Sequence, residues 1–152
     1  MKFDIAIIGA GPSGLGLACA LAKTKLKIAI IEKNLKKKFS NPQNDGRDIA
    51  LTHQSMDILK KIGVWKNINS KKISLVKEAR VLDGNSSKYL HFDHTKTIEK
   101  SLGYLVPNYV IRKAIYEKLQ TLKTIKIFAN NKVLKIVSNK SLSKVYLKNR
   151  KI

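Results

Sequence analysis

A glycine-rich turn near the N-terminus constrains the fold of this chain more than any other feature. The turn is Gly9-Ala10-Gly11-Pro12-Ser13-Gly14, and it directly follows the apolar residues 3–8. A G-x-G-x-x-G spacing alone is weak evidence, but here a predicted strand precedes it and a predicted helix follows it, as the motif requires. The glycines permit a tight turn, close approach of backbone N–H groups to a pyrophosphate, and close packing of helix on strand. Because a helix N-terminus attracts anions, the sequence predicts a nucleotide-cofactor site here.

The residues after the turn predict a β-α-β unit. Residues 12–23 carry small and apolar side chains at helical spacing, and Pro12 suits a first helical turn. Residues 28–31 form a continuous apolar run, which is typical of a parallel strand buried on both faces. Glu32 ends this run, 18 positions after Gly14. An acidic residue there accepts hydrogen bonds from adenosine ribose hydroxyls and repels a 2′-phosphate, which disfavours NADP at this site. The alternative is a glutamate that is only solvated at a strand end.

The net charge of +21, from 31 basic and 10 acidic residues, raises the question of an anionic partner. Most of the excess is lysine spread along the whole chain, together with many Asn and Ile residues, which indicates a compositional bias. Nucleic-acid readers more often cluster arginine and aromatic residues on one face. We therefore expect no nucleic-acid partner, while peripheral attraction to an anionic membrane stays open.

One cysteine, Cys19, excludes an internal disulfide and fits a reducing compartment. Its place in the first predicted helix indicates a buried, unreactive thiol. Asp4, the glycines and Pro12 argue against reading the N-terminus as a signal peptide. No uninterrupted apolar run approaches the roughly 20 residues that span a bilayer. We expect a cytoplasmic protein, with peripheral association at the inner membrane face as an alternative.

The middle of the chain predicts a loop, a helix and a hairpin. Residues 34–48 are polar and loop-like, and Arg47 near their end is placed to reach a phosphate or a ring system. Thr52 is a candidate N-cap for a helix closed by Gly63, with Trp65 beyond it as a packing anchor. Residues 73–81 alternate as one strand does, and residues 83–85 are a turn signal before a returning strand at residues 89–92.

Histidines offer two candidate reactive groups. His53 is a candidate base, but a surface histidine at a helix start is commoner. The sequence His91-Phe92-Asp93-His94 invites a metal interpretation, yet no further ligand set stands nearby. We therefore expect no metal site.

The last third of the chain predicts an extended piece, a helix and short strands. Residues 103–108 read as extended and end at Asn108, a candidate N-cap for a helix with one apolar stripe. Residues 125–147 read as two or three short strands, broken at residues 130–131 and 139–141. No repeat, low-complexity linker or second domain appears, so the fold class is α/β: a Rossmann-like β-α-β unit with additional short antiparallel strands.

The ordered motifs resemble the N-terminal part of FAD-dependent aromatic hydroxylases of the para-hydroxybenzoate hydroxylase type, and most closely the ubiquinone-biosynthesis hydroxylases (UbiH/UbiF-like). The resemblance rests on the glycine turn, on Glu32, on Gly46-Arg47-Asp48-Ile49-Ala50-Leu51, and on residues 103–112. It covers nearly all of the chain. It implies a glutathione-reductase-like FAD domain, incomplete here.

The resemblance implies a set of FAD-binding residues. The glycine turn and the Glu32-Lys33 pair would hold the ADP half, and Arg47 would approach the flavin side. Asn108 and Arg112 fall where the family has a cofactor-contacting helix start. In such enzymes NAD(P)H reduces the flavin, O₂ adds to it, and a flavin hydroperoxide hydroxylates an aromatic ring such as a polyprenyl phenol. The cofactor carries the oxygen chemistry, so no catalytic side chain is expected in this segment.

The chain departs from the family in length. Family members are more than twice as long and continue to Asp-Gly and Gly-Asp motifs that complete the cofactor site, followed by most of the substrate region. We therefore expect residues 1–152 to be the N-terminal portion of an FAD-binding domain, from a truncated frame, a split gene with a separately encoded C-terminal half, or a fragment. Two alternatives remain: another FAD-dependent oxidoreductase such as a polyprenyl reductase, and a non-catalytic nucleotide-binding remnant.

Overall fold

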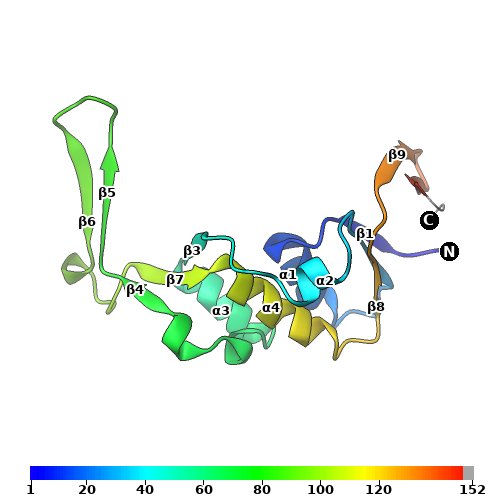
Figure 1. The fold of residues 1–152 in the computed structure, drawn as a ribbon, viewed down its shortest axis with the longest axis horizontal. Coiled ribbons are helices and arrows are strands. Elements are labelled where there is room, and N and C mark those ends of the chain that lie inside the picture. The colour runs from blue at the N-terminus through cyan, green and yellow to red at the C-terminus, as the bar shows by residue number, and fades with distance from the viewer. Residues whose placement is uncertain (149–152) are drawn as a thin grey trace. The chain divides into compact units, whose positions relative to one another are not determined.

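The computed structural model describes residues 1–148 and divides into two compact units. The first unit comprises Met1–Gln43 and the chain from Ile111 onwards, and the second comprises Asn44–Val110. Helix α4 (Asn108–Leu119) begins in the second unit and continues in the first. The α/β class predicted from the sequence is confirmed (Figure 1).

A three-stranded parallel sheet forms the centre of the first unit. It contains β1 (Ile5–Ile8), β2 (Ile28–Ile31) and β8 (Ile125–Phe128), in the order β1-β2-β8. Helix α1 (Pro12–Leu21) connects β1 to β2, which confirms the predicted β-α-β unit. All four residues of β2 are buried, as its continuous apolar run predicted for a strand covered on both faces.

Helix α4 and a short helix before it contribute buried side chains to the first unit. The apolar stripe of α4 is buried at Ile111, Ile115 and Leu119. A one-turn helix, α2 (Lys37–Ser40), lies inside the stretch that was predicted to be loop. That prediction was wrong here because Phe39, which is 1% exposed, packs edge-on against Tyr116 at a centroid distance of 5.6 Å. One buried aromatic side chain therefore organises a stretch that is otherwise rich in lysine.

The antiparallel hairpin of β9 (Val133–Ser138) and β10 (Ser143–Leu147) completes the first unit. Val145 and Leu147 of β10 pack with Ala29, Ile31 and Phe128 of the parallel sheet. The breaks predicted at residues 130–131 and 139–141 fall between β8 and β9 and between β9 and β10, and are confirmed.

The second unit is built on an antiparallel sheet of β3 (Asp48–Leu51), β7 (Gly103–Pro107) and β4 (Ser74–Val76), in the order β3-β7-β4. Helix α3 (His53–Lys61) follows β3, and its N-cap Thr52 accepts a hydrogen bond from Ser55 N–H at 3.1 Å, as predicted. Trp65 packs against Tyr104 with ring centroids 5.5 Å apart, which confirms it as a packing anchor. Short 3₁₀ turns occupy Trp65–Asn67, Ser70–Lys72 and His94–Lys96.

The strand predicted over residues 73–81 is two strands, and the single-strand prediction was wrong. The chain breaks at Lys77, because β4 pairs with β7 whereas β5 (Glu78–Leu82) pairs with β6 (Tyr89–Asp93). The β5–β6 hairpin extends away from the sheet of its own unit (Figure 1). Its turn contains Gly84 at φ +48°, which matches the predicted turn signal.

Within residues 1–148, no helix is both long enough and apolar enough to cross a membrane.

Candidate functional site

The glycine turn joins β1 to α1 and has the geometry that its glycines predict. Gly9 has φ +105°, a conformation that side chains rarely adopt, and its N–H donates to the Ile31 carbonyl at 2.8 Å. A Cβ on Gly14 would lie 2.2 Å from the Gly9 carbonyl oxygen, so the helix approaches the strand closely there. A Cβ on Gly11 would meet nothing within 4 Å. Two glycines therefore shape the turn, while the third leaves open space in front of it.

The N-terminus of α1 carries no side-chain cap. Gly11 is the N-cap residue, Pro12 occupies the first helical turn, and the first turn contains no acidic side chain. The first bond from the helix to the turn runs from Leu15 N–H to the Gly11 carbonyl at 3.0 Å. The first N–H groups of a helix have no acceptor within the helix, so those of this turn, including Ser13 and Gly14, form an anion-binding end.

Glu32 lies against this turn, although it is 22 positions from Ala10. Its carboxylate accepts a hydrogen bond from Ala10 N–H at 2.7 Å through Oε2. Through Oε1 it accepts two more from Asn34, from the backbone N–H at 2.8 Å and from the side-chain amide at 2.7 Å. The residue is only 8% exposed. The structure therefore brings the predicted ribose-binding acid to the predicted phosphate-binding turn.

These donors keep Glu32 ionised. Burial raises the pKa of the carboxyl group, but the hydrogen bonds from Ala10 and Asn34, together with the charge of Lys33, outweigh burial and lower the pKa below its ordinary value of 4.5. Lys33 itself is exposed. Sequence reasoning missed Asn34, which it placed in a loop; its position two residues after the acid was the available signal.

Arg47 and Asn108 meet at Asp45 in the second unit. Arg47 Nε donates to Asp45 Oδ2 at 3.0 Å, and Asn108 Nδ2 donates to the same oxygen at 2.8 Å. Asn108 N–H also donates to the Arg47 carbonyl at 2.8 Å. Asn108 is the first residue of α4, not a cap outside it, and its side chain serves Asp45. Sequence reasoning did not identify Asp45 as the residue that joins these two.

The Arg47 and Asn108 donors lower the pKa of Asp45 from 3.8 to about 2. The Arg47 side chain is 69% exposed, so its guanidinium is open to solvent on one side. Such an arginine can exchange its carboxylate partner for a phosphate or another anion, because guanidinium binds both in the same fork geometry.

Arg112 belongs to the first unit, and its side chain binds a backbone carbonyl of the same unit. Its Nη2 donates to the Lys38 carbonyl at 3.1 Å, which fastens α4 to α2. Its Nε is buried and has no acceptor among residues 1–148. The Nε–H group of Arg112 is therefore a hydrogen-bond donor without an acceptor among the described residues, close to the lysine-rich α2.

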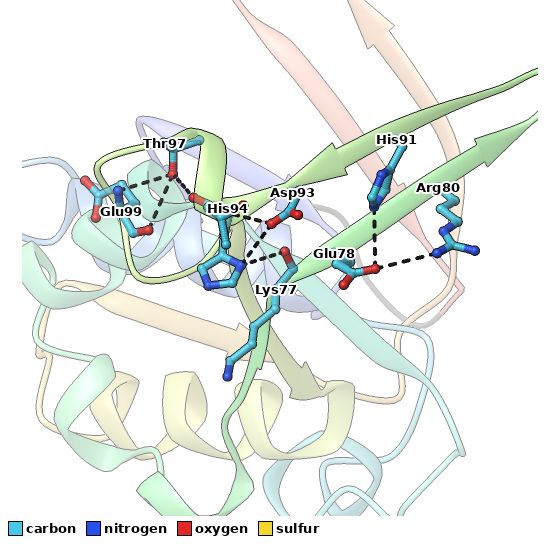
Figure 2. A network of polar contacts seen from close by, with 9 residues as sticks. Lys77, Glu78, Arg80, His91, Asp93, His94, Thr97 and Glu99 are labelled. Carbon is cyan, nitrogen blue, oxygen red and sulfur yellow. Dashed lines mark hydrogen bonds and ion pairs between the residues drawn. The ribbon is translucent and has the colours of Figure 1, made fainter.

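The histidines are tied to structural partners. His53 Nε2 lies 2.8 Å from the Ser101 carbonyl, at the helix start where a structural role was expected. On the hairpin, His91 faces Glu78, whereas His94 turns toward the Lys77 carbonyl and Asp93 (Figure 2). Within residues 1–148, no group of three or more His, Cys, Asp or Glu side chains gathers as a metal site would require.

Cys19 is 5% exposed, and burial raises the pKa of its thiol to about 11. A thiol with that pKa is almost wholly protonated at neutral pH and is a poor nucleophile. The prediction of a buried cysteine is confirmed.

Comparison with known proteins agrees with this geometry. The sequence profile of the FAD binding domain family matches residues 2–151. The ubiquinone hydroxylase UbiM of Neisseria meningitidis is 37% identical over 98% of this chain and 33% of its own length. The 3-demethoxyubiquinol 3-hydroxylase of Escherichia coli is 28% identical over 77% of this chain and 30% of its own length. This chain therefore spans about a third of the length of these relatives.

Solved structures show the same fold at low identity. The p-nitrophenol 4-monooxygenase PnpA of Pseudomonas putida has a TM-score of 0.71 at 19% identity, over 97% of this chain and 37% of that one. The PqsL protein of P. aeruginosa has a TM-score of 0.73 at 18% identity, over 98% of this chain and 40% of that one. The profile match, the glycine turn with its acidic partner, and this likeness agree: the chain belongs to the FAD binding domain family, close to the ubiquinone-biosynthesis hydroxylases it was predicted to resemble.

Proposed function

We propose that the first unit binds the ADP half of FAD. The observation that carries the proposal is the hydrogen bond from Ala10 N–H to the buried Glu32 carboxylate, which sets a ribose-binding acid beside an uncapped helix N-terminus. The open space at Gly11 supports it, since a pyrophosphate must approach the backbone closely there. In this assignment Gly9, Ala10, Gly11, Ser13 and Gly14 form the phosphate cradle, which Pro12 opens as the first helical residue.

The adenosine end is assigned to Glu32 and Lys33. Of the roughly four lone-pair positions of the Glu32 carboxylate, Ala10 and Asn34 use three, so one on Oε2 is left and would accept a hydrogen bond from a ribose hydroxyl. Lys33 is exposed and would lie beside the adenosine without a specific contact.

The flavin side is assigned to Arg47, Asn108 and Arg112. Arg47 supplies an exposed guanidinium, Asn108 orients Asp45 beneath it, and Arg112 keeps α2 against α4. We propose these assignments from the family resemblance. The exposed guanidinium of Arg47 supports the first, whereas Asn108 is 4% exposed and acts through Asp45.

We further propose that the chain is the N-terminal portion of an FAD-dependent monooxygenase that hydroxylates an aromatic ring in ubiquinone biosynthesis. Its support is the family match together with two relatives, one named ubiquinone hydroxylase UbiM and the other 3-demethoxyubiquinol 3-hydroxylase. Bound FAD would supply the oxygen chemistry, with NAD(P)H as electron donor and O₂ as co-substrate. The residues of this chain would bind and orient the cofactor.

The remaining parts of such an enzyme are assigned to a partner segment. Because the relatives are about three times as long, we propose that residues 1–152 act with a separate C-terminal segment that completes the cofactor and substrate sites. A polyprenyl phenol substrate would bring the assembly to a membrane surface, where the net charge of +21 would favour anionic lipid.

Two experiments separate these proposals. FAD is titrated into the purified chain by fluorescence quenching, and saturable binding that ADP-ribose competes away is expected. A chimaera then joins this chain to the remaining two thirds of the meningococcal UbiM and is assayed for NAD(P)H oxidation and for oxygen-dependent hydroxylation of a polyprenyl phenol.

The intact UbiM is the positive control, and the chimaera carrying Gly11→Ala is the matched negative control. Binding of FAD without hydroxylation by the chimaera would contradict the monooxygenase proposal alone. Failure of the chain to bind either FAD or ADP-ribose would contradict the cofactor proposal.

A further inference from the structure

Two of the three hydrogen bonds that the Glu32 carboxylate accepts come from outside the glycine turn. Asn34 donates twice to Glu32 Oε1, from its backbone N–H at 2.8 Å and from its side-chain amide at 2.7 Å. We propose that Asn34 is a positioning residue, which fixes the Glu32 carboxylate toward an adenosine ribose with a free 2′-hydroxyl and so strengthens rejection of a 2′-phosphate. This inference rests on the proposed ADP-binding role of the turn.

Asn34 is itself held in place by the turn between β8 and β9. Its carbonyl accepts a hydrogen bond from Asn130 N–H at 2.9 Å, and the Glu32 carbonyl accepts one from Asn131 N–H at 2.9 Å. Asn130 has φ +55°, in the left-handed region that asparagine adopts more readily than most residues. The two backbone bonds fasten the segment after β2 at both Glu32 and Asn34, so the amide of Asn34 meets the carboxylate in one fixed geometry.

The neighbouring charges show why this fixation matters for specificity. Lys33 lies next to Glu32, and Lys36, Lys37 and Lys38 follow within a few residues. These cations attract a 2′-phosphate, whereas the ionised Glu32 carboxylate repels it. The hydrogen bonds from Ala10 and Asn34 lower the pKa of Glu32 against the effect of burial, so they keep that repulsion in force. Without the Asn34 amide, the repulsion from Glu32 would be weaker, and the attraction of the lysines for a 2′-phosphate would be less fully opposed.

The test compares two ligands on the full chain by isothermal titration calorimetry: ADP-ribose and 2′-phospho-ADP-ribose. For Asn34→Ala we expect the affinity for ADP-ribose to fall about 10- to 100-fold, the value of one hydrogen bond to a charged group, and the preference over the 2′-phosphorylated ligand to shrink. The pH below which ADP-ribose binding weakens is expected to move upward, because Glu32 loses a donor that lowers its pKa.

Asn139→Ala is the matched control. Asn139 also belongs to the first unit, and its side chain accepts hydrogen bonds from Ser141 and Leu142 N–H in the β9–β10 turn. Its loss is expected to change thermal stability but neither the ligand preference nor the pH midpoint. A ligand ratio and pH midpoint in Asn34→Ala that equal those of the wild type would overturn the inference.

A second variant keeps the test decisive if Asn34→Ala folds poorly. Asn34→Asp has nearly the same shape, but its ionised side chain cannot donate and repels the Glu32 carboxylate. Titration of the Glu32 carboxyl carbon by NMR, without ligand, is expected to show a higher pKa than in the wild type. An unchanged pKa would overturn the inference, whereas a wild-type chain that does not bind ADP-ribose would contradict the proposed function itself.

Discussion

Glu32 in the first unit and Asp45 in the second are both carboxylates with lowered pKa values, yet they are held in opposite ways. Glu32 is 8% exposed, and its three hydrogen bonds come from uncharged donors, two of them backbone N–H groups. Asp45 is bonded to the guanidinium of Arg47, whose side chain is 69% exposed, and to the Asn108 amide.

Glu32 therefore has a geometry that the fold itself fixes, whereas an incoming ligand can rearrange the Arg47–Asp45 pair. The donors to Glu32 are fixed by the β1–α1 turn and by the segment after β2, so its geometry depends on the fold of the first unit. The Arg47–Asp45 pair is exposed and screened by salt, and Arg47 can turn to an anionic ligand at little cost. We therefore propose that rigid backbone groups recognise the ADP half of FAD, and that the exposed Arg47 contacts the flavin side.

The largest expected effect is on the rigid site. Gly14→Ala places a Cβ 2.2 Å from the Gly9 carbonyl oxygen, so the helix must move away from the strand. We expect a loss of about 3 kcal/mol in the free energy of unfolding, measured by urea denaturation.

Gly11→Ala is the matched control, because a Cβ there meets nothing within 4 Å. We expect it to change the free energy of unfolding by less than about 1 kcal/mol. Its affinity for ADP-ribose should nevertheless fall at least about tenfold, since the added methyl group would occupy the space that we propose for the pyrophosphate. Equal stability of the two variants would contradict the close packing assigned to Gly14.

A smaller effect is expected from exchanging each carboxylate for an amide. Glu32→Gln leaves buried N–H donors facing an amide, and we expect it to cost about 2 kcal/mol in unfolding free energy. ADP-ribose affinity should fall, and affinity for 2′-phospho-ADP-ribose should rise. Asp45→Asn should leave ADP-ribose binding unchanged, and any change in its melting temperature should vanish in about 0.5 M NaCl. A larger stability loss in Asp45→Asn than in Glu32→Gln would reverse the comparison.

The smallest expected effect is the loss of fold stability as Asp45 is protonated in an acid titration. A carboxyl group with a lowered folded-state pKa stabilises the fold above its unfolded-state pKa, and this contribution is lost as the pH falls through the folded-state pKa. For Asp45 the loss therefore lies between about pH 4 and pH 2.

Added salt separates the two groups in the same titration. We expect about 0.5 M NaCl to raise the pKa of Asp45 toward 3.8, because Arg47 supplies its strongest donor. The pKa of Glu32 should move less, because neutral donors set most of it. NMR titration of the two carboxyl carbons at low and high salt measures both, and equal salt shifts would contradict the distinction.

The predictability of the two regions differs for the same physical reason. The β-α-β unit was predictable because local patterns specify it: an apolar run, a glycine turn, a helical spacing and a second apolar run. The long-range contacts that hold the segment after β2 in place were not predictable. Asn34 and Asn130 meet across 96 positions, and no pattern within either segment announces that pairing.

In the second unit, sequence reasoning placed Arg47 and Asn108 at a site but missed Asp45, which joins them. It also merged β4 and β5 into one strand. The apolar alternation of residues 73–81 is interrupted at Lys77, where the chain changes its partner strand from β7 to β6. Pairing with distant strands therefore determines where β4 ends and β5 begins.

The most direct test of the central claim is competition for FAD on the wild-type chain. FAD fluorescence is followed while ADP-ribose or FMN is added, so that each half of the cofactor competes separately. We predict that ADP-ribose displaces FAD and that FMN does not, because the fixed contacts of Glu32 and the glycine turn address the ADP half. Displacement by FMN with no effect of ADP-ribose would contradict that claim.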